Sequence, residues 1–235
     1  MAAAQLTPPI LATHTLPSGQ SLLIQQKVDG QTPSRQDFQT HLKTFAAVLH
    51  QTHQNEDLKK LLLPNEPHSH KYLAQTAFNH VAGKWRDYRP QLHDLADKVD
   101  RELARLREEI KTIEGEGVVA SHNDSCNDNW LITGANEVFL IDLDSMTLDD
   151  PAVDLGALLW WYYPPEMRGR FLVQMGYQYD DQLKKRMRIR MSIHCLNILL
   201  PRENSFDQFD PNGFASQIVD FFAVANGNKN PQGYA

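Results

Sequence analysis

Residues 121–129, which read Ser-His-Asn-Asp-Ser-Cys-Asn-Asp-Asn, form the densest polar cluster of the sequence. They lie between two short apolar segments of strand type, 118–120 and 130–132. Three of the polar residues follow the pattern H-x-D-x-x-x-x-N, namely His122, Asp124 and Asn129. A polar loop that is held by strands is a common position for a binding or catalytic site. We therefore expect chemistry at this loop.

A pair of carboxylates follows at the end of the next predicted strand, residues 138–141. Asp142 ends that strand and Asp144 comes two residues later. Phosphoryl transfer requires a carboxylate to accept the proton of the attacking hydroxyl, and oxygen ligands to hold Mg²⁺ against the nucleotide phosphates. Asp124 would supply the base, and Asn129 and Asp142 would supply metal ligands. This pairing of a loop with a strand end is similar to a kinase active site.

A third motif, Asp-Pro-Ala-Val-Asp-Leu, occupies residues 150–155. With the two earlier motifs in this order, the chain resembles the aminoglycoside phosphotransferase and choline kinase family, which commonly carries Asp-Pro-x-x-Asp-Leu after the second aspartate. The Ser-His-Asn-Asp wording of residues 121–124 looks closest to the choline kinase-type members. The resemblance covers residues from about 14 to about 200 and implies a protein-kinase-like fold.

The resemblance implies roles for individual residues. It makes Asp124 the catalytic base, with His122 and Asp154 as supports of the catalytic loop. The magnesium ligands that it implies are Asn129, Asp142 and Asp144. Residues 22–30 resemble the hinge after the last N-lobe strand, and the backbone that would contact adenine belongs to Gln25, Gln26 and Lys27. ATP and Mg²⁺ are thus the implied cofactors, and a hydroxyl of a small molecule is the implied acceptor.

Only about twenty residues precede this hinge, which leaves no room for the glycine-rich loop, the strand lysine and its glutamate partner. We therefore interpret residues 1–30 as a remnant of the last N-lobe strand and the hinge. Residues 31–226 would form a helical C-lobe, and residues 227–235 a C-terminal tail. Such a chain should bind ATP poorly and expose an uncovered docking surface, which favours a homodimer.

The fold class that we expect is α+β and mainly helical, with a small β-hairpin that carries the catalytic and metal loops. Near the N-terminus, a Pro-Ser-Gly turn and the apolar run 22–24 predict a hairpin or a final strand. We interpret residues 54–90 as loop plus short helix, because their aromatic residues show no firm period. Helical spacing predicts helices over 35–53, 91–115, 152–163, 166–177, 181–200 and 214–225.

Composition and charge exclude several classes of protein. The 23 Lys and Arg residues against 29 Asp and Glu give a net charge of −6, which does not favour nucleic acid as a partner. Two cysteines are too few for a disulfide framework and suit a reducing compartment. The sequence shows no signal peptide and no run of about 20 apolar residues. We expect a cytoplasmic protein with no membrane partner.

Simpler structural interpretations compete with some of these assignments. An isolated Asp-x-x-x-x-Asn is usually a polar turn, although three ordered motifs make that interpretation weak here. Asp150 and Asp154 fit a helix N-terminus, and we assign them structural roles. Trp160–Tyr163 could line a pocket for a quaternary ammonium group, but four successive helical residues mostly pack in a core.

Histidine pairs and one thiol are further alternatives. His50 with His53, or His68 with His70, could form metal pairs, but no Cys or carboxylate accompanies them at zinc spacing. Cys126 lies in the catalytic loop without an identifiable base, so we interpret it as a loop filler. The leading functional hypothesis is an ATP- and magnesium-dependent small-molecule kinase. The alternative is a pseudokinase without an N-lobe, or a truncated fragment, with a binding or regulatory role.

Overall fold

A computed structural model describes residues 6–62, 69–201 and 209–227 of the chain. Its strands are β1 Ile10–Thr15, β2 Ser21–Gln25, β3 Gly30–Gln31, β4 Val119–Ser121, β5 Trp130–Thr133, β6 Val138–Leu140 and β7 Thr147–Asp149. Its α-helices are α1 Arg35–Thr40, α2 Leu42–His53, α3 Glu56–Leu61, α4 His70–Tyr88, α5 His93–Ile110, α6 Ala152–Tyr162, α7 Pro165–Gln174, α8 Asp181–Leu199, α9 Pro211–Gln217 and α10 Val219–Ala225. The fold is therefore α+β and rich in helices.

The strands form three small antiparallel sheets. β1 pairs with β2, and β4 pairs with β7. β5 lies between β3 and β6, with Trp130 opposite Leu140 in the β5–β6 register. This pairing places the residues that precede β5 beside those that follow β6, so the two polar segments of the sequence lie at the same end of one sheet.

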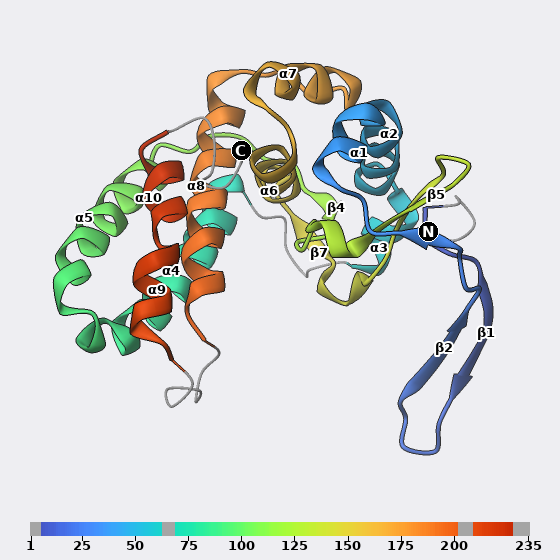
Figure 1. Ribbon diagram of the computed structural model, residues 1–235, viewed down its shortest axis with the longest axis horizontal. Coiled ribbons are helices and arrows are strands. Elements are labelled where there is room, and N and C mark those ends of the chain that lie inside the picture. Colours follow the sequence, from blue (N-terminus) through green and yellow to red (C-terminus); the bar gives the residue numbers. More distant parts are fainter. Residues whose placement is uncertain (1–5, 63–68, 202–208, 228–235) are drawn as a thin grey trace.

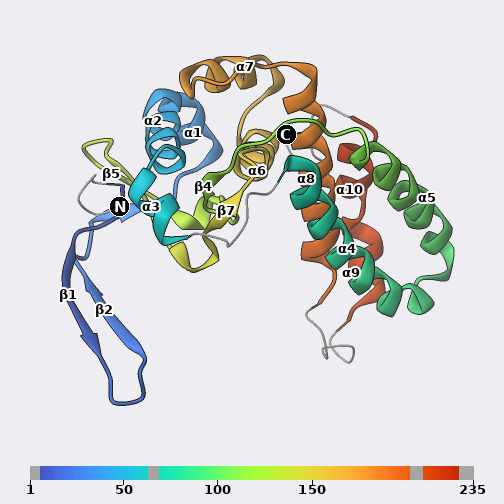
Figure 2. The same ribbon diagram turned by 180° about the vertical axis from the view of Figure 1, so that it is seen from behind.

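The helices lie in two groups, which Figures 1 and 2 show from opposite sides. α4, α5, α8, α9 and α10 pack together on one side, and α1, α2 and α3 lie with β4, β5 and β7 on the other. α6 and α7 lie between the two groups. α6 and α8 make the most extensive contact between helices. The polar segments therefore lie on the strand-bearing side, next to α6.

Each group has its own hydrophobic core. The core beneath β5 and β6 contains Phe38, Phe45 and Trp130, all fully buried, and the rings of Phe45 and Trp130 lie edge to face at 5.3 Å. The core of the helical group stacks Trp85 on Phe214 at 6.0 Å. Burial of one such side chain contributes roughly 1.5–3 kcal/mol. The first core holds β5 and β6 rigidly, and with them the loops that they carry.

The interpretation of residues 54–90 as loop plus short helix is wrong, because α4 runs for 19 residues within that segment. Ser69 caps the helix, since its hydroxyl accepts a hydrogen bond from the amide of Tyr72. Polar residues between the apolar ones obscure the period, although the buried apolar positions do step by three or four: Ala74, Phe78, Val81, Trp85 and Tyr88. One of these buried positions, Ala74, is an alanine, which contributes only weakly to the helical hydrophobic pattern of α4.

Other expected helices differ at their ends or by a break. The predicted helix 35–53 is interrupted at His41, which separates α1 from α2. Its predicted start is confirmed, because Ser34 and Asp37 form a reciprocal capping box. The predicted helix 214–225 forms two short helices that meet at Ile218. Of the predicted tail, residues 228–235 lie outside the described residues, as do residues 1–5 and His68.

The β1–β2 hairpin projects from the rest of the molecule, as both views show. Its two strands expose five large apolar side chains, those of Ile10, Leu11, Leu22, Leu23 and Ile24. The division into lobe remnant, C-lobe and C-terminal tail stays a prediction, and so does the homodimer. Among the described residues, no helix combines the length and the apolar character that crossing a bilayer requires.

Candidate active site

The polar loop begins where β4 ends, at Ser121, and leads through a 3₁₀ turn at Asn127–Asn129 into β5. Asn123 has a φ of 63°, in the left-handed region that Asn tolerates better than most residues. The left-handed conformation of Asn123 lets residues 121–125 fold around one buried carboxylate. The loop geometry therefore depends on a side chain from another element.

That carboxylate is Asp154, in the first turn of α6. Its Oδ2 accepts hydrogen bonds from the Ser121 hydroxyl and the His122 amide, both at 2.9 Å. Its Oδ1 accepts from the Asn123 amide at 2.9 Å and the Ser125 hydroxyl at 2.7 Å. The helix N-terminus explains why an acid suits this position, but the carboxylate itself binds the polar loop rather than its own helix.

A histidine completes the surroundings of Asp154. His53, the last residue of α2, places Nε2 at 3.0 Å from Oδ2, and both side chains are fully buried. Burial alone would raise the pKa of Asp154. The His53 hydrogen bond and charge, with those from Ser125 and the His122 amide, lower that pKa to about 2. The carboxylate is therefore ionised and accepts all five hydrogen bonds.

The loop is also tied to the end of β6. His122 is buried, and its Nε2 lies 2.9 Å from the carbonyl oxygen of Ile141. The Ile141 amide donates to the Asn129 carbonyl, and the Asn129 side-chain amide donates to the Asp124 carbonyl at 2.8 Å. The structure thus brings His122, Asp124 and Asn129 next to the segment that carries Asp142, and His122 acts on loop geometry.

Asp142 and Asp144 lie beside each other and are exposed. Asp142 has a φ of 57°, a strained conformation for a residue other than glycine. A hydrogen bond with the Asp144 carboxyl and the charge of Asp144 raise the pKa of Asp142, and the charge of Asp124 adds to this. The charges of Asp144 and Asp124 thus both act against ionisation of Asp142, and a bound cation would relieve that repulsion.

In the described part of the chain, no group of three or more His, Cys, Asp or Glu side chains could hold a metal ion. A smaller set of oxygen donors, on Asn129, Asp142 and Asp144, does fit Mg²⁺. This ion prefers oxygen ligands and usually takes only one or two carboxylates together with substrate phosphates. The Asn129 side-chain nitrogen is used by the Asp124 carbonyl. The amide oxygen of Asn129 has no hydrogen-bond partner among the residues that the structure describes.

A cavity of about 490 Å³ opens beside Asp124. Its other polar and aromatic walls include Arg35, Trp161, Tyr162 and His194, from α1, α6 and α8. Burial lowers the pKa of His194, which keeps this imidazole neutral near pH 7. We call this cavity the acceptor pocket. Neither His194 nor Trp161 is near the motif in sequence, so spacing could not have found them.

The surroundings of Tyr162 and Cys126, at the loop, indicate structural roles for both. Tyr162 accepts a hydrogen bond from the Asn127 amide at 2.8 Å, and burial raises its pKa to about 12. Burial, followed by the nearby charge of Asp124, raises the pKa of Cys126. A thiol with a raised pKa is a poor nucleophile, which agrees with the interpretation of Cys126 as a loop filler.

The residues expected to contact adenine are less closely tied to the site. Gln25, Gln26 and Lys27 are exposed at and after the end of β2. The Gln26 amide donates to the Pro9 carbonyl at 2.8 Å, so it is not free to bind a nucleotide base. The chain then runs into β3, which pairs with β5 beside the catalytic loop. The segment therefore reaches the edge of the site through β3.

His50 and His53 each have their own hydrogen-bond partners. His50 places Nδ1 at 2.9 Å from the Met175 carbonyl, whereas His53 bonds Asp154 and, through Nδ1, the Tyr177 hydroxyl at 3.1 Å. Asp150 accepts from the Ala152 amide and pairs with Arg186, which fits the structural role expected for it. His70 likewise bonds a backbone carbonyl, that of Gly117.

Comparison with known proteins gives the family of this chain. The model of the phosphotransferase enzyme family matches residues 1–189. The chain belongs to this family, and the resemblance drawn from its motifs to aminoglycoside phosphotransferases and choline kinases is confirmed. The order of three short motifs was therefore sufficient to find the family.

Solved structures share the fold at low sequence identity. A choline/ethanolamine kinase family protein from Mesorhizobium loti is 17% identical over 96% of this chain and 81% of its own, with a TM-score of 0.62. Ethanolamine kinase from Plasmodium vivax is 16% identical over 97% and 70%, with a TM-score of 0.64. The GDP complex of aminoglycoside 2'-phosphotransferase-IIIa is 14% identical over 95% and 75%, with a TM-score of 0.65. The fold is that of protein-kinase-like small-molecule kinases.

Proposed function

We propose that this protein transfers the γ-phosphoryl group of ATP, with Mg²⁺, to a hydroxyl group of a small molecule. The observation that carries the proposal is the position of Asp124. It lies in the wall of the acceptor pocket, on a loop that Asp154 holds through four hydrogen bonds, and its negative charge helps to raise the pKa of Asp142. A base, an acceptor cavity and metal-binding oxygens therefore meet at one place.

The chemistry assigns Asp124 the role of general base. The acceptor hydroxyl binds in the pocket and gives its proton to the Asp124 carboxylate while its oxygen forms a bond to the γ-phosphorus. The bond between that phosphorus and the bridging oxygen of ADP breaks, and the bonding electrons leave with ADP. The products are a phosphate ester, ADP and one proton. Most of the rate then depends on positioning, which the rigid loop supplies.

Asn129 and Asp142, assisted by Asp144, would hold the magnesium ion. When bound, Mg²⁺ would neutralise charge on the nucleotide phosphates and orient the γ-phosphoryl group. The repulsion that raises the pKa of Asp142 is consistent with this role. Asn129 also fixes the catalytic loop through the Asp124 carbonyl, so one residue couples the metal ligands to the base.

Nucleotide binding at the segment Gln25–Lys27 is part of the proposal. Three solved structures of similar fold are complexes with GDP, ATP or AMP, which supports a nucleotide site in this fold. The Gln26 amide donates its hydrogen bond to Pro9, so the edge of a nucleotide base would have to use other backbone groups of this segment.

An intact loop that carries both the catalytic carboxylate and the metal ligands favours an active enzyme over a pseudokinase.

The charge of the acceptor pocket favours a small alcohol with few charges. Among the described lining residues, Asp124 is the one carboxylate and Arg35 is a cation. A polycationic aminoglycoside would find little compensating charge there, whereas the Trp161 side chain offers apolar surface to a compact acceptor.

The experiment that tests the function is a screen of small alcohols with MgATP. Release of ADP is followed continuously, and phosphorus NMR identifies the ester product. We expect ester formation with at least one amino alcohol or other compact alcohol, and little with kanamycin. Hydrolysis of ATP without an ester for any acceptor would contradict the assignment as a phosphotransferase to an alcohol group.

A further inference from the structure

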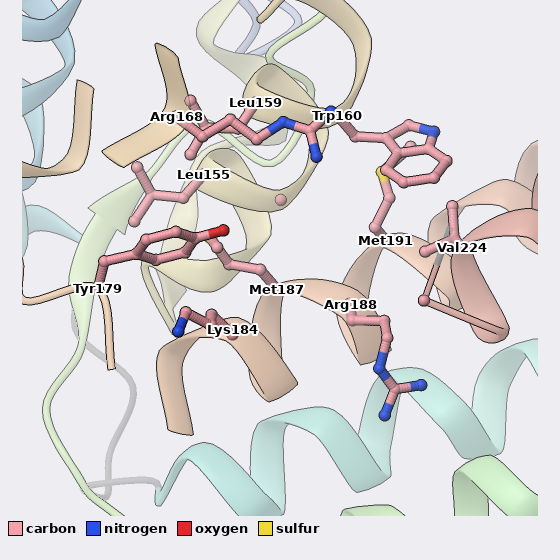
Figure 3. Close-up of a pocket in the computed structure, with 12 residues that line it drawn as sticks. Leu155, Leu159, Trp160, Arg168, Tyr179, Lys184, Met187, Arg188, Met191 and Val224 are labelled. Atoms are coloured by element: carbon pink, nitrogen blue, oxygen red, sulfur yellow. The ribbon is translucent and has the colours of Figure 1, made fainter. Parts of the chain in front are cut away.

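One face of α8 lines two cavities in succession. Met187, Met191, His194 and Ile198 follow one another at intervals of four, three and four residues, so they form a single stripe along the helix. Met187 and Met191 line a cavity of about 220 Å³ between α6, α7, α8 and α10 (Figure 3). His194 and Ile198 line the acceptor pocket. A histidine therefore stands in an otherwise apolar stripe at the point where that stripe reaches the acceptor pocket.

The cavity in Figure 3 has its charged groups engaged by the protein. Among the described residues that line it, each cation has a partner: Arg168 donates to the Tyr163 carbonyl, Lys184 pairs with Asp181, and Arg188 pairs with Glu109. The rest of the lining is mostly apolar. The accessible polar group that the stripe offers to a ligand is therefore His194, in the acceptor pocket.

The imidazole of His194 has no hydrogen-bond partner among the residues that the structure describes. The side chain is partly buried, but neither ring nitrogen is fully buried, so a molecule in the pocket can reach them. Burial lowers the pKa of His194, although the charge of Asp124 acts in the opposite direction. A neutral imidazole carries one hydrogen-bond donor and one acceptor. Both are available to a bound molecule.

Asn127 adds a donor to the same pocket. Its side-chain oxygen accepts from the Tyr162 hydroxyl at 3.1 Å, whereas its side-chain nitrogen has no partner in the described part of the chain. The pocket thus presents an acceptor on Asp124, a donor on Asn127, and one of each on His194. A hydroxyl group both donates and accepts, so it matches all three. An ammonium group only donates, so it cannot bind the Asn127 donor.

We propose that the acceptor is an uncharged polyol and that His194 binds a second hydroxyl group of it, while the reacting hydroxyl gives its proton to Asp124. This inference rests on the proposed function and names the class of its acceptor. The Trp161 side chain offers apolar surface to the carbon chain of such a molecule. The cavity of about 490 Å³ has room for several hydroxyl groups. His194 is then a specificity-determining residue rather than the base.

The kinetic test compares three acceptors of equal chain length with MgATP: erythritol, 1-butanol and 4-amino-1-butanol. Erythritol carries a hydroxyl on every carbon, so the test does not depend on one spacing. We expect kcat/KM to be roughly tenfold or more higher for erythritol than for 1-butanol. His194→Leu should raise the KM for erythritol roughly 3–10-fold with little change in kcat, and should leave 1-butanol unaffected. His194→Gln retains a donor and an acceptor and should largely restore that KM.

A binding measurement separates this inference from the proposed function. NMR of the full chain with labelled histidine, with His194→Gln used to assign the His194 ring signals, follows titration with erythritol in the presence of MgADP. We expect the His194 signals to shift to saturation and those of His80, exposed on α4, to stay unchanged. Such a shift without ester formation from any alcohol would contradict the proposed function and still support polyol binding at His194.

Three results would overturn the inference itself. The first is the absence of any shift of the His194 signals with erythritol. The second is an equal kcat/KM for erythritol and 1-butanol, and the third is a higher kcat/KM for 4-amino-1-butanol than for erythritol. His80→Gln is the control variant and should keep the wild-type KM for erythritol, because His80 lies outside the lining of the acceptor pocket.

Discussion

His53 Nε2 lies 3.0 Å from Asp154 Oδ2, and the two side chains join the end of α2 to the start of α6 without contact with water. An ionised carboxylate can only accept hydrogen bonds, so Nε2–H is the donor. On the other side of the ring, Nδ1 lies 3.1 Å from the Tyr177 hydroxyl. The catalytic loop therefore depends on a buried pair whose members are far apart in sequence.

Loss of His53 should destabilise the protein. In His53→Ala, Asp154 stays buried with its strongest partner removed, and breaking a buried pair costs about 3–5 kcal/mol. His50→Ala, one turn earlier on α2, removes a hydrogen bond to a backbone carbonyl and should cost about 1 kcal/mol. Urea unfolding of the two variants checks the contrast. Equal losses in the free energy of unfolding would contradict the large contribution assigned to the His53–Asp154 pair.

Ionisation of Asp154 should make the free energy of unfolding depend on pH in the acid range. Its folded pKa of about 2 lies below the value of about 3.9 for an unfolded chain, so ionisation favours the folded state. This contribution, about 2 kcal/mol, is present above pH 4 and is lost as the pH falls toward 2. The difference in melting temperature between wild type and Asp154→Asn should therefore narrow from pH 5 to pH 2.5. A constant difference over that range would contradict the depressed pKa.

Asp142 should control magnesium-dependent nucleotide binding. Mg²⁺ alone should bind weakly, because two or three protein oxygens do not complete its coordination shell. Asp142→Ala should weaken MgATP binding at least tenfold in calorimetric titration. Glu137→Gln, an exposed acid at the β5–β6 turn, is the control and should leave binding unchanged. Tight binding of Mg²⁺ without nucleotide would show that the metal ligands have been assigned wrongly.

The acceptor pocket can be narrowed without touching the base. Ala157 lines it from α6 and is only partly buried, so Ala157→Leu adds bulk to the cavity. We expect the KM for the acceptor to rise roughly tenfold or more while the KM for MgATP changes little. Steady-state kinetics with each substrate varied in turn separates the two. A rise confined to the KM for MgATP would place the nucleotide, rather than the acceptor, in this cavity.

Local sequence predicted the loop but not its supports. His122, Asp124 and Asn129 lie within eight residues, so their spacing can be recognised in the sequence, and Asp142 follows the paired strand. His53 and His194 reach the site from α2 and α8 through tertiary packing. Periodicity carries no information about such long-range contacts.

The helices illustrate the same limit. α5 was evident because its polar and apolar faces are well separated. α4 was missed because both His70 and Lys84 are buried on it, which breaks the contrast between its faces. His70 bonds the Gly117 carbonyl and Lys84 bonds Asn197, so distant residues satisfy these polar groups. Only the folded structure shows that these positions are internal.

The most direct test of the central claim is the turnover of Asp124→Asn with MgATP and an accepted alcohol. The asparagine keeps the shape of the loop but cannot accept the hydroxyl proton, so the rate of ester formation should fall roughly 10²–10⁴-fold. Asp128→Asn, an exposed acid in the same loop, should keep near-wild-type turnover and the same melting temperature. Turnover of Asp124→Asn within a few-fold of the wild type would contradict the assignment of Asp124 as the catalytic base.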